Sequence, residues 1–237
     1  MITERESEIL KWIEQNPMIT QEELAQRAGI ARSSVAVHIS NLMKKGKILG
    51  KGYVVQKKPY VTVVGGANMD IIGYPDSQLI PHESNPGRVE LSFGGVGRNQ
   101  AHNLSLLDID VKMISVFGED MYAEKIQHSC RELGIDISCS LTVPNGITST
   151  YLSTIDFNGQ GLFGIADMEI YDELTPQVLE SKMNIVNNAR VCITETNLSK
   201  AALEYLAEKC QVTLFVEAIS IAKAAKLKDI LDKIHTL

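Results

Sequence analysis

The sequence predicts an α/β protein of two domains, a small helical domain at residues 1–58 and a larger α/β domain at residues 59–237. Helix-start signals and helical apolar spacing dominate up to residue 45, whereas apolar β-rich runs alternate with helical stretches from residue 60 onward. The charge also changes sign there: residues 1–58 carry ten Lys and Arg against six Asp and Glu, and residues 59–237 carry thirteen against twenty-three. Two domains with different partners are therefore expected.

The first domain is expected to contain three helices. Two capping boxes mark the starts of the first two: Thr3 with Glu6, and Thr20 with Glu23. The first helix should end before Pro17, and the second should cover residues 21–28 because Gly29 then turns the chain. A third helix, from about Arg32 to Lys45, should bury one apolar face. Its expected core residues are Val35, Ile39, Leu42 and Met43.

Residues 48–55 alternate glycine and lysine between apolar ends, as a hairpin with a basic tip would. The series of helices, glycine turn and basic hairpin resembles the winged helix-turn-helix of bacterial transcriptional regulators. That resemblance implies binding of duplex DNA, with bases read by the third helix and phosphates held by lysines. The implied base readers are Arg32, Ser33, Ser34 and His38; the implied phosphate contacts are Lys44, Lys45, Lys47 and Lys51. The alternatives are a solvated helix face, or a dimerising module that binds no DNA.

The larger domain should contain a parallel sheet, because its strands and helices alternate. The expected strands of that sheet are 60–64, 111–117, 191–194 and 212–216, and the helices are 121–133, 176–188, 199–210 and 222–234. Shorter runs bounded by Pro, Asn and Gly are assigned to a side sheet. These runs are 89–93, 136–143, 150–155 and 161–165.

A glycine-dense stretch at residues 93–99 runs straight into an apolar-periodic segment at residues 101–107. Glycines without a Cβ let the backbone approach a ligand, and free amides at a helix start favour polar oxygens. The spacing matches neither the dinucleotide fingerprint nor a Walker A loop. The stretch therefore indicates a ligand site of another kind, or a tight strand-to-helix turn that binds nothing.

Three motifs in the larger domain resemble the ribokinase-like (phosphofructokinase B) family of carbohydrate and nucleoside kinases, and within it the bacterial pseudouridine kinases. They are Gly65-Gly66-Ala67-Asn68-Met69-Asp70, Glu83-Ser84-Asn85-Pro86-Gly87 and Gly94-Gly95-Val96-Gly97-Arg98-Asn99. The resemblance implies a truncated ribokinase-like α/β domain with a small β lid over the sugar. It also implies transfer of the ATP γ-phosphate to a ribose 5′-hydroxyl, with pseudouridine as the nucleoside. A transcriptional regulator that uses this domain as a sugar or nucleoside sensor is the alternative.

The family resemblance also implies which residues bind the substrate. Asp70, expected just past the first strand, would hold the ribose hydroxyls together with Gly94, Gly95 and Asn99, while Asn68 would shape the turn. A carboxylate at that place can accept two hydrogen bonds from a diol. Asp167 is a candidate for the base or lid contact. Taken alone, Asp70 and Asp167 could equally cap a turn or loop, and Arg98 could offer a cation or form a surface ion pair.

The chain departs from the family at several points. Asp108 replaces a usual Gly or Ser but tolerates turn geometry, and Glu217-Ala218 replaces a usual Asp-Pro. The family's metal-associated Asn-x-x-Glu element and its Gly-Ala-Gly-Asp element, which carries the catalytic Asp, occur nowhere in the sequence. The sites for ATP and Mg²⁺ are therefore expected to be largely absent, and we expect this chain to lack kinase activity.

Composition restricts the remaining possibilities. With 44% apolar and 22% charged residues, the chain resembles an ordinary globular protein. The four cysteines have no metal-ligand spacing, so reduced core thiols are expected. No apolar run is long enough to span a membrane and the N-terminus is charged, so we expect no membrane partner, no signal peptide and a cytoplasmic location. We also expect a homodimer.

Overall fold

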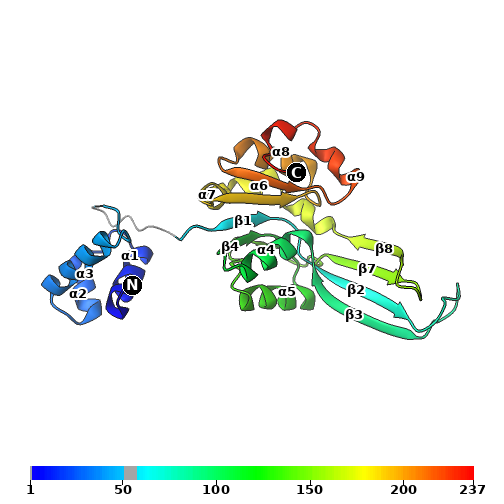
Figure 1. Cartoon of the computed structure of the whole chain (residues 1–237), viewed down its shortest axis with the longest axis horizontal. Coiled ribbons are helices and arrows are strands. Elements are labelled where there is room, and N and C mark those ends of the chain that lie inside the picture. Colours follow the sequence, from blue (N-terminus) through cyan, green and yellow to red (C-terminus); the bar gives the residue numbers. More distant parts are fainter. Residues whose placement is uncertain (1, 51–57) are drawn as a thin grey trace. The chain divides into compact units, whose positions relative to one another are not determined.

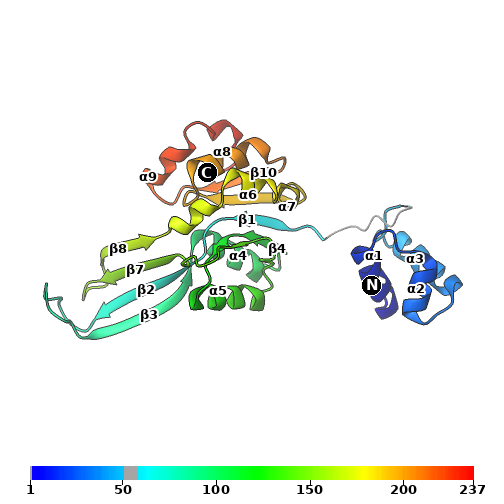
Figure 2. The ribbon, with the colours of Figure 1, turned by 180° about the vertical axis from the view of Figure 1, so that it is seen from behind.

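The computed structural model describes residues 2–50 and 58–237. The chain forms two compact units, Met1–Lys58 and Pro59–Leu237 (Figures 1 and 2). The first unit contains three helices: α1 (Glu4–Gln15), α2 (Gln21–Ala28) and α3 (Arg32–Lys44). Both predicted capping boxes are present, and Gly29 ends α2 in the left-handed conformation with φ 63°. These local signals explain why the predicted and observed helix ends agree within one residue.

The core of the first unit consists of apolar side chains from all three helices. Ile9, Ile13, Leu24, Val35, Ile39 and Leu42 are among its buried members. Met43, predicted to belong to this core, is 43% exposed, so that prediction is wrong. Because successive helical residues lie 100° apart, Leu42 and Met43 cannot both face the centre of so narrow a core. The predicted hairpin at residues 48–55 lies mostly outside the described residues.

An ion pair links the first and third helices. Lys45 Nζ lies 2.7 Å from Oε2 of Glu6, a side chain that is buried and also completes the capping box with Thr3. The hydrogen bond from Lys45, followed by that from the Thr3 backbone, lowers the pKa of Glu6 to about 2. The carboxylate therefore stabilises the start of α1 and its packing against the end of α3.

The second unit is built on a four-stranded parallel sheet in the order β10-β9-β1-β4. Its strands are β1 (Val61–Val64), β4 (Val111–Ile114), β9 (Val191–Glu195) and β10 (Thr213–Glu217). The helices are α4 (Val96–Leu106), α5 (Met121–Glu132), α6 (Pro176–Glu180), α7 (Met183–Asn187), α8 (Lys200–Lys209) and α9 (Ile221–Ala224). The parallel sheet predicted from strand and helix alternation is thus confirmed, and the neighbouring folds described below confirm the fold class.

Helices lie on both faces of this sheet (Figure 1), and each face has its own apolar core. Val63 and Met113 point into the core shared with α4 and α5, whereas Val64 and Ile114 point into the core shared with α6, α7 and α8. All four side chains have 0% exposure. Adjacent residues of one strand therefore pack into opposite cores, which explains why the sequences of these strands are continuous apolar runs.

A second four-stranded sheet, the lid, extends away from the first (Figures 1 and 2). Its order is β3-β2-β7-β8, with strands β2 (Asn68–Pro75), β3 (Gly87–Gly94), β7 (Thr150–Ile155) and β8 (Gly161–Asp167). β2 pairs antiparallel with β3 and parallel with β7. The sequence predicted the other three strands here but missed β2, because Asp70 and Gly73 interrupt its apolar pattern.

Four predicted elements differ from the structure. The strand predicted at 111–117 ends as β4 at Ile114, and residues 116–117 form β5 in a separate two-stranded sheet. Residues 136–143 do not belong to the lid: β6 (Leu141–Thr142) pairs with β5 (Val116–Phe117) beside the parallel sheet. The helix predicted at 176–188 is split into α6 and α7. The helix predicted at 222–234 consists of α9 and two 3₁₀ turns, η2 (Ala225–Leu227) and η3 (Leu231–Lys233). These turns bury Leu227 and Ile230, and the chain then pairs with β10 through Thr236.

Among the described residues, no helix is both long and apolar enough to cross a lipid bilayer. The four cysteines are free thiols.

Asp108 adopts a φ of 57°, as expected from the tolerance of Asp for the left-handed region. Ile219, just after the Glu217-Ala218 departure, has a φ of 55°, which is unusual for a β-branched residue and shows that the chain turns sharply at the end of β10.

Candidate functional site

The candidate site lies where the parallel sheet passes into the lid. β1 ends at Val64, residues 65–67 cross over, and β2 begins at Asn68. Asp70, expected just past the end of the first strand, is the third residue of a lid strand and lies opposite Ser92 of β3. Because strand pairing with β3 and β7 holds its backbone on both sides, the Asp70 side chain projects from a fixed position.

Three of the predicted sugar-binding residues meet at this place. Asn68 Nδ2 donates a hydrogen bond to Asp70 Oδ1 at 2.5 Å. The Asp70 carboxylate lies directly against Cα of Gly94, where any side chain would overlap it. Burial raises the pKa of Asp70, and the hydrogen bond from Asn68 opposes that rise. The result is a carboxylate with reduced solvation and free acceptor capacity, a suitable group for binding hydroxyls.

The glycine run is used for close contact between two backbone segments. Gly95 has a φ of 94°, and a Cβ there would lie 2.5 Å from the carbonyl oxygen of Gly66. A Cβ on Gly97 would lie 2.8 Å from the carbonyl carbon of Gly65. α4 consequently starts at Val96, inside the predicted turn, and the Arg98 amide donates to the Gly66 carbonyl oxygen at 3.0 Å. The run thus packs the start of α4 onto the crossover from β1 to β2.

Asn99 and Arg98 point to different environments. Asn99 is exposed on the first turn of α4. Arg98 is only 5% exposed: its guanidinium donates to the Phe93 carbonyl oxygen at 3.2 Å and to Ser129 Oγ at 3.1 Å. Arg98 therefore links the base of β3 to α5, and it forms no ion pair with any other described residue.

Glu195 is a component of this site that the sequence reasoning missed. It ends β9, has 0% exposure, and its Oε1 accepts a hydrogen bond from the Gly66 amide at 2.8 Å. Its Oε2 accepts from the Asn197 amide at 2.5 Å. Burial raises its pKa, and these backbone hydrogen bonds act against the rise. A signal existed, because a carboxylate directly after a predicted parallel strand lies at the edge where α/β proteins bind ligands.

Tyr171 is a second missed residue. It lies in η1 (Glu169–Glu173), is 1% exposed, and its ring packs so closely on Gly66 that a Cβ there would lie 2.6 Å from Cζ. Burial raises its pKa. No local pattern marks a single tyrosine in a short turn, so the sequence offered no signal for it.

Asp167 lies apart from this cluster in the lid. It is the exposed last residue of β8, paired across the sheet with Thr150. It lines a groove of about 610 Å³ together with Ile147 and several acidic residues, namely Glu169, Asp172 and Glu173. The structure therefore places Asp167 in an acidic surface groove.

The model of the pfkB family carbohydrate kinases matches residues 58–237. The chain belongs to this family. A winged helix-turn-helix DNA-binding model matches residues 2–48, so the first unit is a winged helix-turn-helix unit attached to the pfkB domain.

Two relatives from Escherichia coli (strain K12) cover much of the chain. The uncharacterized sugar kinase YeiI is 41% identical over 234 residues, which are 98% of this chain and 65% of that protein. A pseudouridine kinase is 35% identical over 184 residues, 77% of this chain and 59% of that protein. The chain thus spans less than two thirds of the length of either relative.

Solved structures of the pfkB domain agree with this fold. A carbohydrate kinase from Agrobacterium tumefaciens superimposes with a TM-score of 0.67 at 29% identity, over 75% of this chain and 59% of that one. A ribokinase from Arabidopsis thaliana, solved with ribose and ATP, gives a TM-score of 0.62 at 20% identity, over 70% and 55%. The latter likeness shows the fold alone.

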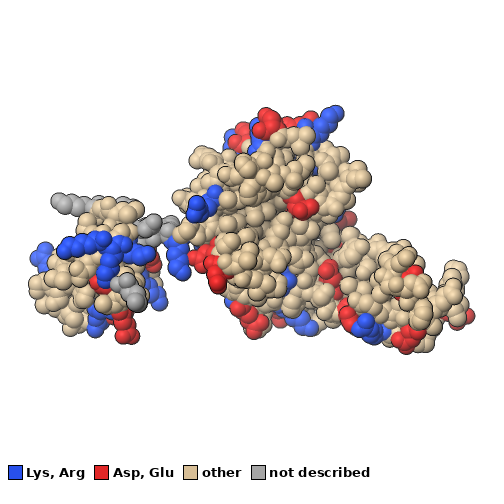
Figure 3. Space-filling model, in the orientation of Figure 1, with Lys and Arg blue, Asp and Glu red and all other residues tan. Residues whose placement is uncertain are grey.

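The predicted DNA-binding residues of the helix-turn-helix unit lie on α3 and just after it. Arg32, Ser33, Ser34, Lys44 and Lys47 are exposed, and His38 is partly buried with no hydrogen-bond partner for Nδ1. Lys45 differs, because its ammonium is paired with Glu6. Lys51 lies outside the described residues. Figure 3 shows Lys and Arg gathered over the visible face of this unit.

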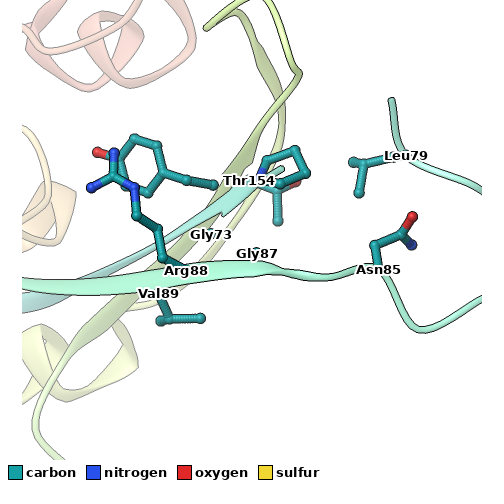
Figure 4. A pocket seen from close by; sticks show the side chains of 9 residues that line it. Gly73, Leu79, Asn85, Gly87, Arg88, Val89 and Thr154 are labelled. Carbon is teal, nitrogen blue, oxygen red and sulfur yellow. The ribbon is translucent and has the colours of Figure 1, made fainter. Parts of the chain in front are cut away.

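A small groove lies at the outer end of the lid (Figure 4). Gly73, Arg88 and Thr154 are among its lining residues, and its volume is about 180 Å³. That volume is below the roughly 300 Å³ of a typical ligand pocket. Asn85, from the motif at residues 83–87, exchanges two hydrogen bonds with the backbone of Ile80 and so stabilises the hairpin loop. The motif therefore has a structural role at the end of the lid.

Proposed function

We propose that the pfkB domain binds pseudouridine and belongs to a kinase that phosphorylates the ribose 5′-hydroxyl. The observation that carries this proposal is the Asp70 carboxylate, held by Asn68 and lying against Gly94 at the base of the lid. Similarity to a pseudouridine kinase supports the choice of nucleoside. Asp70 accepts hydrogen bonds from two ribose hydroxyls, backbone groups at Gly94 and Gly95 approach the sugar, and exposed Asn99 donates to it. Asp167 contacts the base from the lid.

The residues of this chain do not fit an ATP and magnesium site. Neither Asn-x-x-Glu nor Gly-Ala-Gly-Asp occurs in the sequence. In residues 2–50 and 58–237, no group of three acidic, thiol or imidazole side chains could hold a metal ion. We therefore expect no ADP when the purified chain is incubated with ATP, Mg²⁺ and pseudouridine. Turnover that Asp70→Ala abolishes would show that catalytic residues have been overlooked.

Substrate binding can be tested on the chain itself by calorimetric titration with pseudouridine. Asp70→Asn should weaken binding at least about tenfold, because charge-assisted hydrogen bonds contribute roughly 1.5–3 kcal/mol. Asp76→Asn, at an exposed position just after β2, is the matched control and should leave the affinity unchanged. Equal affinity for free ribose would contradict the assignment of pseudouridine but not that of a sugar site.

The helix-turn-helix unit is proposed to bind duplex DNA, on the strength of its family match and of the exposed polar residues of α3. In gel-shift assays, Lys47→Ala should weaken binding to all sequences and reduce its salt dependence, whereas Ser34→Ala should alter sequence preference. Lys11→Ala removes an exposed charge from α1 and should have no effect. Absence of a shift at low salt would refute DNA binding.

A transcriptional regulator that senses a nucleoside through the pfkB domain is the second candidate, since the DNA-binding match is the observation in its favour. Pseudouridine should then change the affinity of the chain for its DNA. An unchanged affinity would leave the kinase as the better assignment.

The expected homodimer, also a proposal, would be measured by sedimentation. It is supported by exposed apolar side chains on the lid: Val89, Leu91, Phe163 and Ile165.

A further inference from the structure

Two half-buried lysines lie at the carboxyl end of the parallel sheet. Lys223 belongs to α9 and Lys226 to η2. Lys226 Nζ donates to the carbonyl oxygens of Thr196 at 2.9 Å and Leu198 at 2.8 Å, and Lys223 Nζ donates to Asn197 Oδ1. Both ammonium groups therefore face the loop that follows β9.

Carboxylates attract these two ammonium groups only from beyond ion-pair distance: Glu195 attracts both, and Asp172 attracts Lys226. In the part of the chain that the structure describes, neither lysine forms an ion pair with a carboxylate, whereas the half-buried Lys112 pairs with Asp136 at 2.6 Å. Burial lowers the pKa of Lys226, and the charge of Lys223 lowers it further, against the weaker opposing effect of Asp172 and Glu195. Two positive charges thus share a partly desolvated place where an anion would stabilise both.

The lysines also retain unused donors. An ammonium has three N–H groups. Lys226 uses two of them on backbone carbonyls and Lys223 uses one on Asn197, so three remain available. Phosphate oxygens accept several such charge-assisted hydrogen bonds, and lysine serves as a common point charge for phosphate.

Glu195 connects this place to the candidate sugar site. Its Oε2 accepts from the Asn197 amide and its Oε1 from the Gly66 amide, at the crossover that leads to Asp70. Glu195 is paired in register with Glu217, the last residue of β10. Ligands of open α/β sheets bind outside such carboxyl ends. A phosphate at the lysines would lie on the same edge of the sheet as the sugar.

We propose that Lys223 and Lys226 form an anion site for the phosphate group of a phosphorylated sugar or nucleoside, an inference that rests on the proposed function of the same edge. Lys223 and Lys226 each direct free N–H groups at the phosphate oxygens, while their present hydrogen bonds hold the loop after β9. The site recognises the phosphate ester formed by the proposed reaction.

The test is calorimetric titration of the purified chain with inorganic phosphate and with ribose 5-phosphate. Lys223→Met and Lys226→Met should each weaken both ligands about tenfold, because each variant lacks charge-assisted hydrogen bonds to the phosphate oxygens. Lys228→Met, an exposed position two residues away, should bind as the wild type does. Unchanged affinity in both variants would overturn the proposal.

Three further measurements separate the possible failures. Lys226→Met also removes two hydrogen bonds to backbone carbonyls, so two measurements that leave Lys226 in place are added: the affinity of Lys223→Gln for phosphate, and an NMR titration of the Lys226 side chain. Phosphate should raise the pKa of Lys226, and the absence of a rise would count against the site. Asp70→Asn should keep inorganic phosphate binding and lose the preference for ribose 5-phosphate. If phosphate binds through the lysines but no sugar or nucleoside binds, the anion site stands and the proposed function fails.

Discussion

The parallel sheet and the lid differ in how they are covered. In β1 and β4 nearly every side chain is buried, because helices pack on both faces of that sheet. In β3 and β8 nearly every residue is exposed, including Leu91 and Ile165, each over half exposed. The candidate sugar site lies at the junction of these two regions. A rigid sheet fixes one side of such a site, and a sparsely packed sheet leaves the other side free to adjust to a ligand.

The largest expected difference is in stability. Met113→Ala in β4 removes a side chain with 0% exposure and should cost about 2–5 kcal/mol of the free energy of unfolding. Leu91→Ala in the lid, at 54% exposure, should cost less than about 1 kcal/mol. Urea unfolding followed by circular dichroism measures both. Similar costs would show that the apolar lid is covered in solution.

The junction should be more sensitive to added volume than the lid. Gly94→Ala places a methyl group where the Asp70 carboxylate now lies, so nucleoside affinity should fall at least about tenfold, or about 1.4 kcal/mol. Gly161→Ala in β8 meets no atom within 4 Å and should leave binding unchanged. A Gly94→Ala protein that binds normally would remove Asp70 from the site.

The charge of Asp70 should lower the free energy of unfolding, although it contributes to binding of the nucleoside. Burial raises its pKa, so between its unfolded and folded pKa values the native state binds more protons than the unfolded state, and stability falls as pH rises through that window. Asp70→Asn should lack this fall and be at least as stable as the wild type at neutral pH. Thermal unfolding at several pH values measures the difference; a less stable variant throughout would contradict it.

Glu6 in the first unit should show the opposite dependence of stability on pH. Its pKa is lowered from 4.5 to about 2, so its contribution to stability is complete above pH 4.5 and is lost as pH falls towards 2. Lys45→Met should flatten this acid dependence. Trp12, the single tryptophan of the chain, lies in α1 and reports the unfolding of this unit by fluorescence. Identical acid profiles for the two proteins would exclude the ion pair as the cause.

The sequence by itself determined the elements whose signals are local. The capping boxes at Thr3 and Thr20 and the left-handed Gly29 predicted α1 and α2, because caps and backbone preferences act within a few residues. Continuous apolar runs predicted the strands of the parallel sheet, since burial on both faces leaves a visible pattern. The motifs around Asp70 and Gly94 also identified the family that the comparison confirmed.

Only the tertiary structure decided which distant segments meet. β2 became a lid strand through pairing with β3 and β7, and residues 222–234, predicted as one helix, form the end of α9 and two 3₁₀ turns, with Leu227 and Ile230 buried. The hydrogen bond from Gly66 to Glu195 joins residues 129 positions apart, so no local pattern could reveal it. The raised pKa of Asp70 likewise depends on its surroundings in the fold. Spacing along a chain records periodicity and backbone preference, whereas desolvation and long-range pairing exist only after the segments have packed together.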